Sequence, residues 1–430
     1  MIIHVVQEGE TIYSIADMFG ISAERLIQDN QILTPDNLVT GQSIVITFPE
    51  QTYSVQEGDT LYNIANAFGI SVLQLLRNNP FLSDREFIYP GDTLIISYGD
   101  KIRSIQTHGY CNDFINRSIL RKTLPYLTYL SIFGYRIIEG GEIEQIDDTD
   151  IIAQAYEYNV APLMFLSTIS ERGEENFHVD FNILNNEHLM DTLISNILNI
   201  IKEKNYYGLN ITYRYISAET LQKYELLNTK LTRQLKSEGY PVFITISPNQ
   251  IRQGDLITFE KIDYSVLGQE ADGIMILSYK WGYTYGFPGP ITSIDETRKF
   301  LDYIITQVPA EKILVGQPLI SYDWTLPYTI GVTKANSLTL QSTLVLAQQV
   351  GAIIQFDETS QTPYFVYVDQ TKSGPTNHVV WFVDSRTINS LLELIDEYNL
   401  QGTGIWNIMQ YYSQLWLVTN SQYDIESIIY

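Results

Sequence analysis

The sequence predicts an α/β protein in which two small βααβ units precede a barrel of eight parallel strands wrapped by helices. Two observations support this fold class. A strand–helix–helix–strand pattern occurs twice within residues 1–98, and from about residue 103 apolar runs of strand length alternate with longer amphipathic segments. Alternating strands and helices are typical of a parallel sheet that is covered by helices.

The two N-terminal units are an internal repeat. The segments "VVQEGETIYSIADMFGIS" (5–22) and "SVQEGDTLYNIANAFGIS" (54–71) align at an offset of 49, and 12 of the last 17 aligned positions are identical. Apolar residues in each segment recur at i, i+3, i+4 and i+7, which gives one apolar helical face. We therefore predict two βααβ domains, at residues 1–49 and 51–98.

Helix ends are marked in both units. Gly20 and Gly69 stand where the first helix should end, since glycine is the usual residue just past a helix C-terminus. Ser22 and Ser71 are suited to cap the helix that follows. The sequence therefore predicts the same helix boundaries twice.

The remaining residues, 103–430, carry the barrel pattern. Amphipathic patterns such as 187–205 and 296–309 separate the apolar runs. The stretch at about 325–385 is longer than a simple connection, and its short apolar runs predict a small α+β insertion after strand seven. The predicted architecture is a (β/α)8, or TIM, barrel, whose functional residues lie at the carboxyl ends of the strands. The eight predicted strands are 104–109, 126–137, 161–168, 206–215, 241–248, 271–282, 312–324 and 402–409.

The chain of 430 residues is strongly acidic. It contains 50 aspartates and glutamates against 26 lysines and arginines, for a net charge of −24. Binding of nucleic acid or of an anionic membrane needs clustered positive charge, so neither is expected as a partner.

Other features narrow the class of protein further. The N-terminus shows no basic region followed by a long apolar run, so we expect no signal peptide and no membrane insertion. Cys111, the single cysteine, is expected to be a buried residue rather than a nucleophile. The five histidines are scattered without metal-ligand spacing, and the sequence predicts no metal and no cofactor.

The two repeats closely resemble LysM domains. The resemblance rests on "VQEGETIYSIA…FGIS", on the asparagines at 30 and 79, and on "GQSIVI" and "YPGDTLII". It implies binding of glycans that contain N-acetylglucosamine, such as peptidoglycan or chitin, in a groove between the loop entering the first helix and the loop leaving the second. The positions that match this groove are Gly9, Glu10, Thr11, Ile12, Asn30, Gln31 and Ile32 in the first unit, and Gly58, Asp59, Thr60, Leu61, Asn79, Pro80 and Phe81 in the second.

The whole chain resembles the spore cortex-lytic N-acetylglucosaminidases, which join LysM repeats to a barrel of glycoside hydrolase family 18. Beyond the repeats, the resemblance rests on "YLTYLSIFGYRI", "APLMFLST", "YYGLNITYRYI", "LSYKWG", "GQPLISYDWTLPY" and "VWFVDSR". It implies a substrate site at the mouth of the barrel. It also implies synthesis in the mother-cell cytoplasm and deposition on the outer layers of the spore.

The catalytic signature of this family is degenerate here. The family carries Gly-x-Asp-x-Asp-x-Glu on strand four, where the Glu is the general acid and the preceding Asp orients the acetamido group of the substrate in a substrate-assisted reaction. After Gly208, the three acidic positions hold Asn210, Thr212 and Arg214. All three should point into the barrel, because side chains on one face of a strand recur every second residue. Arginine stays protonated and cannot usefully donate a proton, so no catalytic residue is intact.

Aromatic residues of the family site persist. Tyr279 in "LSYKWG" matches the tyrosine that contacts the acetamido carbonyl, and Lys280 follows where these relatives usually carry an acid. Trp406 matches the aromatic floor under the reactive sugar. Together with Trp281 and Asp323, Tyr279 and Trp406 are the expected substrate-binding residues of the barrel groove.

Three interpretations of Arg214 stay open. Arg214 replaces the acid structurally and pairs with Asp272, Asp323 or another buried acid; or the groove binds glycan as a lectin, with Arg214 on a carboxylate of peptidoglycan; or a displaced acid such as Asp323 retains some hydrolysis. The sequence favours a binding or structural role for a catalytically inactive barrel. The competing functions are an active cortex-lytic N-acetylglucosaminidase and a scaffold that binds spore coat proteins.

Overall fold

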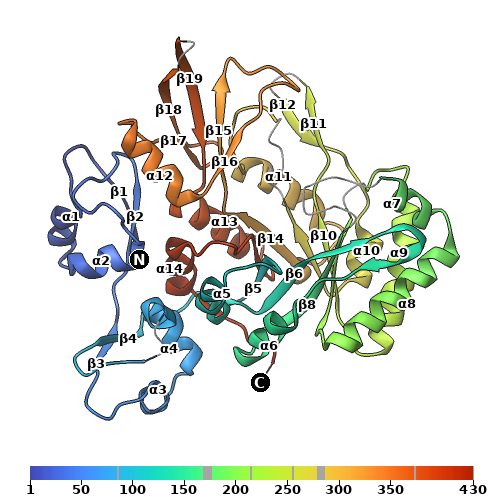
Figure 1. Cartoon of the computed structure of the whole chain (residues 1–430), viewed down its shortest axis with the longest axis horizontal. Coiled ribbons are helices and arrows are strands. Elements are labelled where there is room, and N and C mark those ends of the chain that lie inside the picture. Colours follow the sequence, from blue (N-terminus) through green and yellow to red (C-terminus); the bar gives the residue numbers. More distant parts are fainter. Residues whose placement is uncertain are drawn as a thin grey trace.

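Two small units and one large barrel make up the computed structural model of the chain (Figure 1). The small units lie along one side of the barrel, and a β-rich insertion projects at the end of the molecule away from the C-terminus (Figure 1). The structure describes residues 1–84, 87–167, 177–213, 216–253, 256–277, 286–371 and 374–429.

The N-terminal units fold as the repeat predicts, and in each of them the two strands pair antiparallel. Gly20 and Gly69 adopt left-handed conformations at the helix ends, and Ser22 and Ser71 cap the following helices, so these predictions are confirmed. The elements are β1 (Ile2–Val5), α1 (Ile12–Phe19), α2 (Ala23–Asn30) and β2 (Ser43–Ile46), then β3 (Gln51–Ser54), α3 (Leu61–Phe68), α4 (Val72–Asn78), the 3-10 turn η1 (Pro80–Asp84) and β4 (Thr93–Ser97).

Eight parallel strands close into a barrel, because the first of them pairs with both the second and the eighth. All eight coincide with predicted segments. In chain order they are β5 (Arg103–Asn112), β6 (Tyr129–Ile137), β8 (Ala161–Ser167), β9 (Gly208–Tyr213), β10 (Val242–Ile246), β13 (Gly273–Ile276), β14 (Ile313–Pro318) and β20 (Gly402–Trp406).

Helices surround the barrel, and aliphatic side chains between the two layers form the main hydrophobic core. Cys111 is free and buried, as predicted. The helices are α5 (Arg117–Thr123), α6 (Thr149–Glu157), α7 (Phe177–Leu184), α8 (Glu187–Lys204), α9 (Leu221–Ser237), α10 (Ser265–Glu270), α11 (Ile294–Ile304), α13 (Ser385–Glu397) and α14 (Ser413–Gln422). Short additions are η2 (Leu124–Tyr126), η3 (Glu139–Gly141), β7 (Ile143–Glu144), the hairpin β11 (Gln250–Gln253) and β12 (Leu256–Phe259), η4 (Ala310–Lys312) and β21 (Tyr423–Ile425).

The insertion after strand seven begins earlier than the sequence suggests. The segment 312–324 was predicted as one strand, but β14 ends at Pro318 and β15 (Ser321–Leu326) starts a separate sheet. The run stays apolar through Leu319 and Ile320, so periodicity does not reveal the change of sheet. The sheet has the order β16-β15-β19-β18-β17, and its other elements are β16 (Asn336–Leu338), α12 (Leu340–Gln349), β17 (Gln355–Asp357), β18 (Thr362–Thr371) and β19 (Gly374–Trp381).

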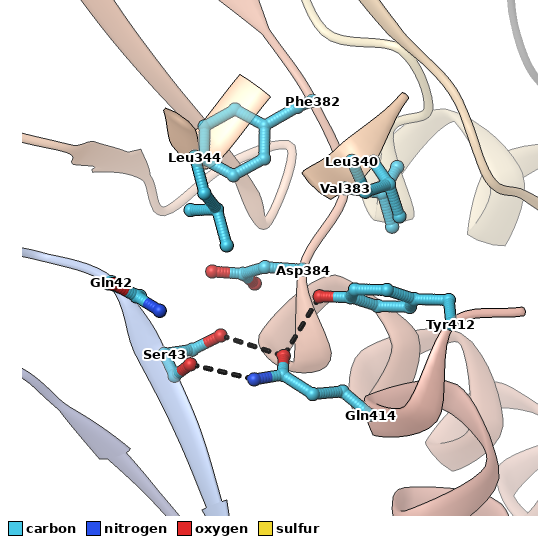
Figure 2. Close-up of a pocket in the computed structure, with 9 residues that line it drawn as sticks. All are labelled: Gln42, Ser43, Leu340, Leu344, Phe382, Val383, Asp384, Tyr412 and Gln414. Carbon is cyan, nitrogen blue, oxygen red and sulfur yellow. Dashed lines mark hydrogen bonds between the residues drawn. The ribbon is translucent and has the colours of Figure 1, made fainter. Parts of the chain in front are cut away.

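The first N-terminal unit is docked firmly on the barrel. Its Val45 belongs to the main hydrophobic core. Gln414, at the start of α14, donates from Nε2 to Asn30 Oδ1 at 3.1 Å. Its Nε2 also donates to Ser43 O (2.9 Å), and its Oε1 accepts from Tyr412 Oη (2.8 Å) (Figure 2). A cavity of about 10 Å³, the space of one water molecule, lies beside these groups (Figure 2).

The second unit is attached through polar contacts. Arg77, buried at the end of α4, donates to the backbone oxygens of Pro125 and Ile425. Asn420 Nδ2 of α14 donates to Asn78 Oδ1 at 2.9 Å. Helix α14 therefore contacts both N-terminal units.

Gly41 provides a test of the first docking contact. A Cβ on Gly41 would lie 2.0 Å from Ile354 O, whereas a Cβ on Gly91, the corresponding glycine of the second unit, meets nothing within 4 Å. Both glycines have a positive φ, +87° and +95°, so alanine is strained at either site. Because only Gly41→Ala adds overpacking, it should lower the free energy of unfolding by about 1–3 kcal/mol more than Gly91→Ala does. Urea unfolding of both variants measures this difference, and equal losses would contradict the docking.

Candidate active site

The carboxyl ends of the parallel strands define the mouth of the barrel. On β9, Asn210 points into the barrel interior, and Thr212 lies on the same side because side chains alternate along a strand. Thr212 is half-buried and its Cα is paired with that of Thr245 on β10. Arg214 and the segment 279–281, which includes the predicted Tyr279 and Trp281, lie outside the described residues.

A hydrogen-bond network of neutral groups surrounds Asn210. Its Nδ2 donates to Tyr110 Oη and to Ser131 Oγ, both at 3.0 Å, and its Oδ1 accepts from Thr245 Oγ1 at 2.9 Å. His108 Nε2 lies 2.7 Å from the same Ser131 Oγ. All five side chains are buried. The family motif places an acid at residue 210, and here a carboxamide satisfies the surrounding hydroxyl groups instead.

The histidine of this network is uncharged. Burial lowers the pKa of His108 to about 3. Its ring stacks on Tyr110 with the centroids 4.7 Å apart, and burial raises the pKa of the Tyr110 phenol above its ordinary value. The barrel interior beneath the mouth is therefore neutral around these two residues at ordinary pH.

Aromatic rings form an apolar floor at the mouth. Trp406, the last residue of β20, packs against Phe133, Phe165 and Tyr110 with centroid separations of 5.9, 5.8 and 5.1 Å. Only 7% of Trp406 and 9% of Phe133 is exposed. The predicted floor residue thus lies within a packed cluster at the strand ends, which holds the indole in one orientation.

Asp323 belongs to a separate cluster on the inserted sheet. Its carboxylate accepts from Tyr367 Oη at 2.8 Å and from His378 Nδ1 at 2.9 Å. The adjacent Trp324 donates from Nε1 to Gly286 O, in the segment after β13, at 2.9 Å. Since neighbours on a strand face opposite sides, the Asp323 carboxylate turns away from that segment.

Asp272, considered from sequence as a partner of Arg214, is at the wrong end of the barrel. It precedes β13, where its Oδ2 accepts from Val242 N at 2.8 Å and its Oδ1 lies 3.1 Å from Lys236 Nζ. These contacts are at the amino ends of the strands. Tyr213, the last described residue of β9, lies at the opposite ends of the strands.

The loops that enter the first helix of each N-terminal unit are accessible. Gly9 and Gly58 are exposed, while Thr11 and Thr60 cap α1 and α3. Backbone groups of both loops can therefore meet a ligand.

The acids of these loops already have partners. Glu10 accepts from Gln7 N and contacts His4 Nε2, both at 2.7 Å. In the second unit, Asp59 accepts in the same way from the backbone of Gln56 and from the phenol of Tyr53. Both carboxylates thus hold the loop in shape.

Asn30 and Asn79 face the interior rather than the predicted groove. Asn30 Nδ2 donates to Val45 O and its Oδ1 accepts from Val45 N, both at 2.8 Å. Asn79 makes the same pair of bonds to Ile95, also at 2.8 Å. Their buried side chains join the second helix to the last strand. Of the other predicted groove residues, Ile12 is buried, Gln31 is exposed, and Ile32, Leu61, Pro80 and Phe81 are partly exposed.

Sequence reasoning missed the residues that surround Asn210. Tyr110, Ser131 and Thr245 come from β5, β6 and β10, and the sequence signal for them was the same alternation that places Asn210 inside the barrel. Within the described ranges, no cluster of three or more His, Cys, Asp or Glu side chains could hold a metal ion. Across those same ranges, every helix is too short or too polar to cross a membrane.

The architecture is a closed (β/α)8 barrel with an aromatic cluster at its mouth, preceded by two βααβ units of the LysM kind. Comparison with known families agrees. The model described as "Glycosyl hydrolases family 18" matches residues 172–410, and the LysM domain model matches residues 4–47 and 53–97. The chain belongs to glycosyl hydrolase family 18 and carries two LysM domains.

The similarity to individual relatives extends over the whole chain. The cortical fragment-lytic enzyme of Bacillus subtilis is 32% identical over 99% of both chains, and the cortical fragment-lytic enzyme of Bacillus anthracis is 31% identical over 98% of both. The crystal structure of the spore cortex-lytic enzyme SleL of Bacillus megaterium superimposes with a TM-score of 0.81, at 29% identity and over 99% of both chains. By their names, these relatives are lytic enzymes of cortical fragments or of the spore cortex, and each aligns with this chain over nearly its whole length.

The lowered pKa of the buried His108 predicts how the free energy of unfolding depends on pH. A histidine in the unfolded chain titrates near pH 6.5, whereas the folded-state pKa of His108 is about 3. The unfolded chain therefore binds a proton that the folded chain does not, and stability that is complete above pH 6.5 is lost as the pH falls toward 3. Replacing His108 by Gln should reduce the difference in unfolding free energy between pH 7 and pH 5 by about 2 kcal/mol.

Chemical denaturation at the two pH values measures the effect. His188→Gln, at an exposed position of α8, is the matched control. It should keep the wild-type difference in unfolding free energy between pH 7 and pH 5. An unchanged difference in the His108 variant would mean that this histidine is not held neutral by the fold.

Proposed function

We propose that this protein binds peptidoglycan or another N-acetylglucosamine-containing glycan of the spore and does not hydrolyse it. One observation carries the proposal: the alternating acidic positions of strand four hold Asn210, Thr212 and Arg214. The LysM domains and the aromatic floor at Trp406 are retained as binding elements. The names of the relatives refer to the spore cortex, and we propose the outer layers of the spore as the location of this chain.

The chemistry of the substituted positions supports a loss of catalysis. General-acid assistance contributes about 10²–10⁴ in rate, and arginine cannot supply it. Threonine at position 212 brings no negative charge to stabilise the oxazolinium-like intermediate. Arginine also adds positive charge where positive charge develops on the sugar, which raises the barrier.

The surroundings of Asn210 point in the same direction. Each described partner of its carboxamide is a neutral hydroxyl group. A carboxylate in this buried place would meet no cation in the network, and burial of an unpaired charge is costly. The neutral carboxamide of Asn210 is therefore fully hydrogen-bonded in this site, where a carboxylate would be an unpaired buried charge.

Hydrolysis is the second candidate function, and the names of the relatives favour it. The relatives are named lytic enzymes and align with nearly the whole chain. Hydrolysis by this chain would need an acid outside the motif. Asp323 is engaged by Tyr367 and His378 on the inserted sheet, which gives it little support as that acid.

A digestion experiment separates these functions. Spore cortex fragments are incubated with the wild-type chain, with a Thr212→Asp, Arg214→Glu double variant, and with Arg233→Glu, which repeats the arginine-to-glutamate charge reversal on the exposed face of α9. Bound glycan is measured in each sample, and products are identified by chromatography and mass spectrometry. We expect the wild-type chain and the control to bind without new reducing ends above a no-protein blank, and the double variant to gain measurable cleavage.

Each other outcome has a distinct meaning. New reducing ends from the wild-type chain would show that it is an active hydrolase. Absence of both binding and cleavage would favour a scaffold for spore coat proteins.

A further inference from the structure

A cleft on the rim of the barrel mouth lies outside the sites described above. It opens between the turn η3, which follows β6, and helix α7, which follows β8, with the start of α8 at its base. Its volume is about 420 Å³, which is within the range of sites for small ligands. Helices α7 and α8 occupy the side of the barrel opposite the LysM domains (Figure 1).

The cleft is adjacent to the mouth. Strands β6, β8 and β9 are consecutive neighbours in the barrel. Neighbouring strands are separated by about 4.8 Å, so the end of β6 lies about 10 Å from the end of β9. A ligand held at the mouth can therefore reach the cleft with a side branch, without leaving its main binding site.

The walls of the cleft are fixed by packing. A Cβ on Gly141 would lie 2.8 Å from Leu189 O, and Asn196 Nδ2 of α8 donates to Gly141 O at 3.0 Å, so η3 is pressed onto α8. Val179 and Ile183 of α7 are buried and give the cleft an apolar floor. Contacts within the chain thus set the shape of the cleft.

One carboxylate and several carboxamides surround the floor, and one of these carboxamides, that of Asn185, already accepts from Lys223 Nζ. Glu139 and Asn182 are exposed at the edge, and no cation of the described chain pairs with Glu139. Asn186 Oδ1 caps α8 by accepting from His188 N at 3.0 Å, and its amide group has further donors. Carboxamides match peptide groups, a carboxylate matches an ammonium group, and an aliphatic floor matches a methylene chain. The lining contributed by described residues contains no aromatic ring on which a sugar would stack.

We propose that this cleft binds the peptide stem of peptidoglycan through an amino group of the stem, while the LysM domains and the barrel mouth bind the sugar backbone. The inference rests on the proposed function in glycan binding and names its ligand more closely. Chitin carries no peptide stem, so the cleft would make the protein select peptidoglycan over chitin.

The test compares two probes with the same sugars. One is a disaccharide carrying a tetrapeptide stem with a diamino acid, and the other is the same disaccharide after enzymatic removal of the stem. Calorimetric titration of the full chain should show tighter binding of the stem-bearing probe. Glu139→Gln should weaken binding of that probe about tenfold, as expected for loss of a charged hydrogen bond, and leave the stemless probe unaffected.

Two further variants make the result specific. Asn182→Ala should also weaken binding of the stem-bearing probe, by a smaller factor than Glu139→Gln does. Glu311→Gln, at an exposed position of η4 at the amino ends of the strands, is the matched control and should bind both probes like the wild-type chain. All variants should keep the wild-type unfolding midpoint.

The failures are distinguishable. Equal binding of both probes, with no effect of Glu139→Gln, would overturn the cleft proposal and leave the glycan function standing. An equal loss for both probes in Glu139→Gln would mean that the cleft contacts sugar, which also overturns it. Binding of neither probe by the wild-type chain would overturn the proposed function itself.

Discussion

The alternation of side chains along β9 is the constraint on which the site depends. Because side chains alternate along a strand, Asn210 and Thr212 both face the inside of the closed barrel, and the groups at these two positions set the polarity of the strand there. The carboxamide of Asn210 forms hydrogen bonds with side chains from β5, β6 and β10, so its position depends on three other strands of the barrel. The barrel thus keeps the framework of a glycosidase while its described interior around Asn210 is neutral.

The docking of the LysM domains gives this barrel a fixed relation to its binding modules. Helix α14 meets the first domain through Gln414 and the second through Asn420. The first domain also contributes Val45 to the main core, whereas the second is held by Arg77 and other polar groups. The accessible loops at Gly9 and Gly58 therefore have defined positions relative to the barrel.

Much of the fold follows from periodicity and repetition. The duplicated βααβ pattern, its Gly and Ser boundaries and the eight apolar strands are local signals, and the structure confirms each of them. The break between β14 and β15 was not predictable in this way, because the chain stays apolar where it passes from the barrel to the inserted sheet. Local pattern also cannot tell that Asp272 lies at the amino ends of the strands.

The site was predictable only in part. The inward direction of Asn210 followed from alternation, but its partners come from three other strands and depend on how the barrel closes. Asn30 and Asn79 match the groove positions of LysM domains, yet tertiary packing turns their amides onto the backbone of Val45 and Ile95. The rim cleft has no sequence signal, because η3 and α7 are 36 or more residues apart in the chain.

Native mass spectrometry of the wild-type chain with a defined peptidoglycan oligosaccharide tests the loss of catalysis most directly, because it reports the bound ligand and its integrity together. We predict that the complex keeps the mass of the intact oligosaccharide throughout a prolonged incubation. Complexes or free species with the masses of cleaved products, absent from a blank without protein, would contradict this prediction. They would show that the chain hydrolyses the glycan and that the barrel contains a general acid.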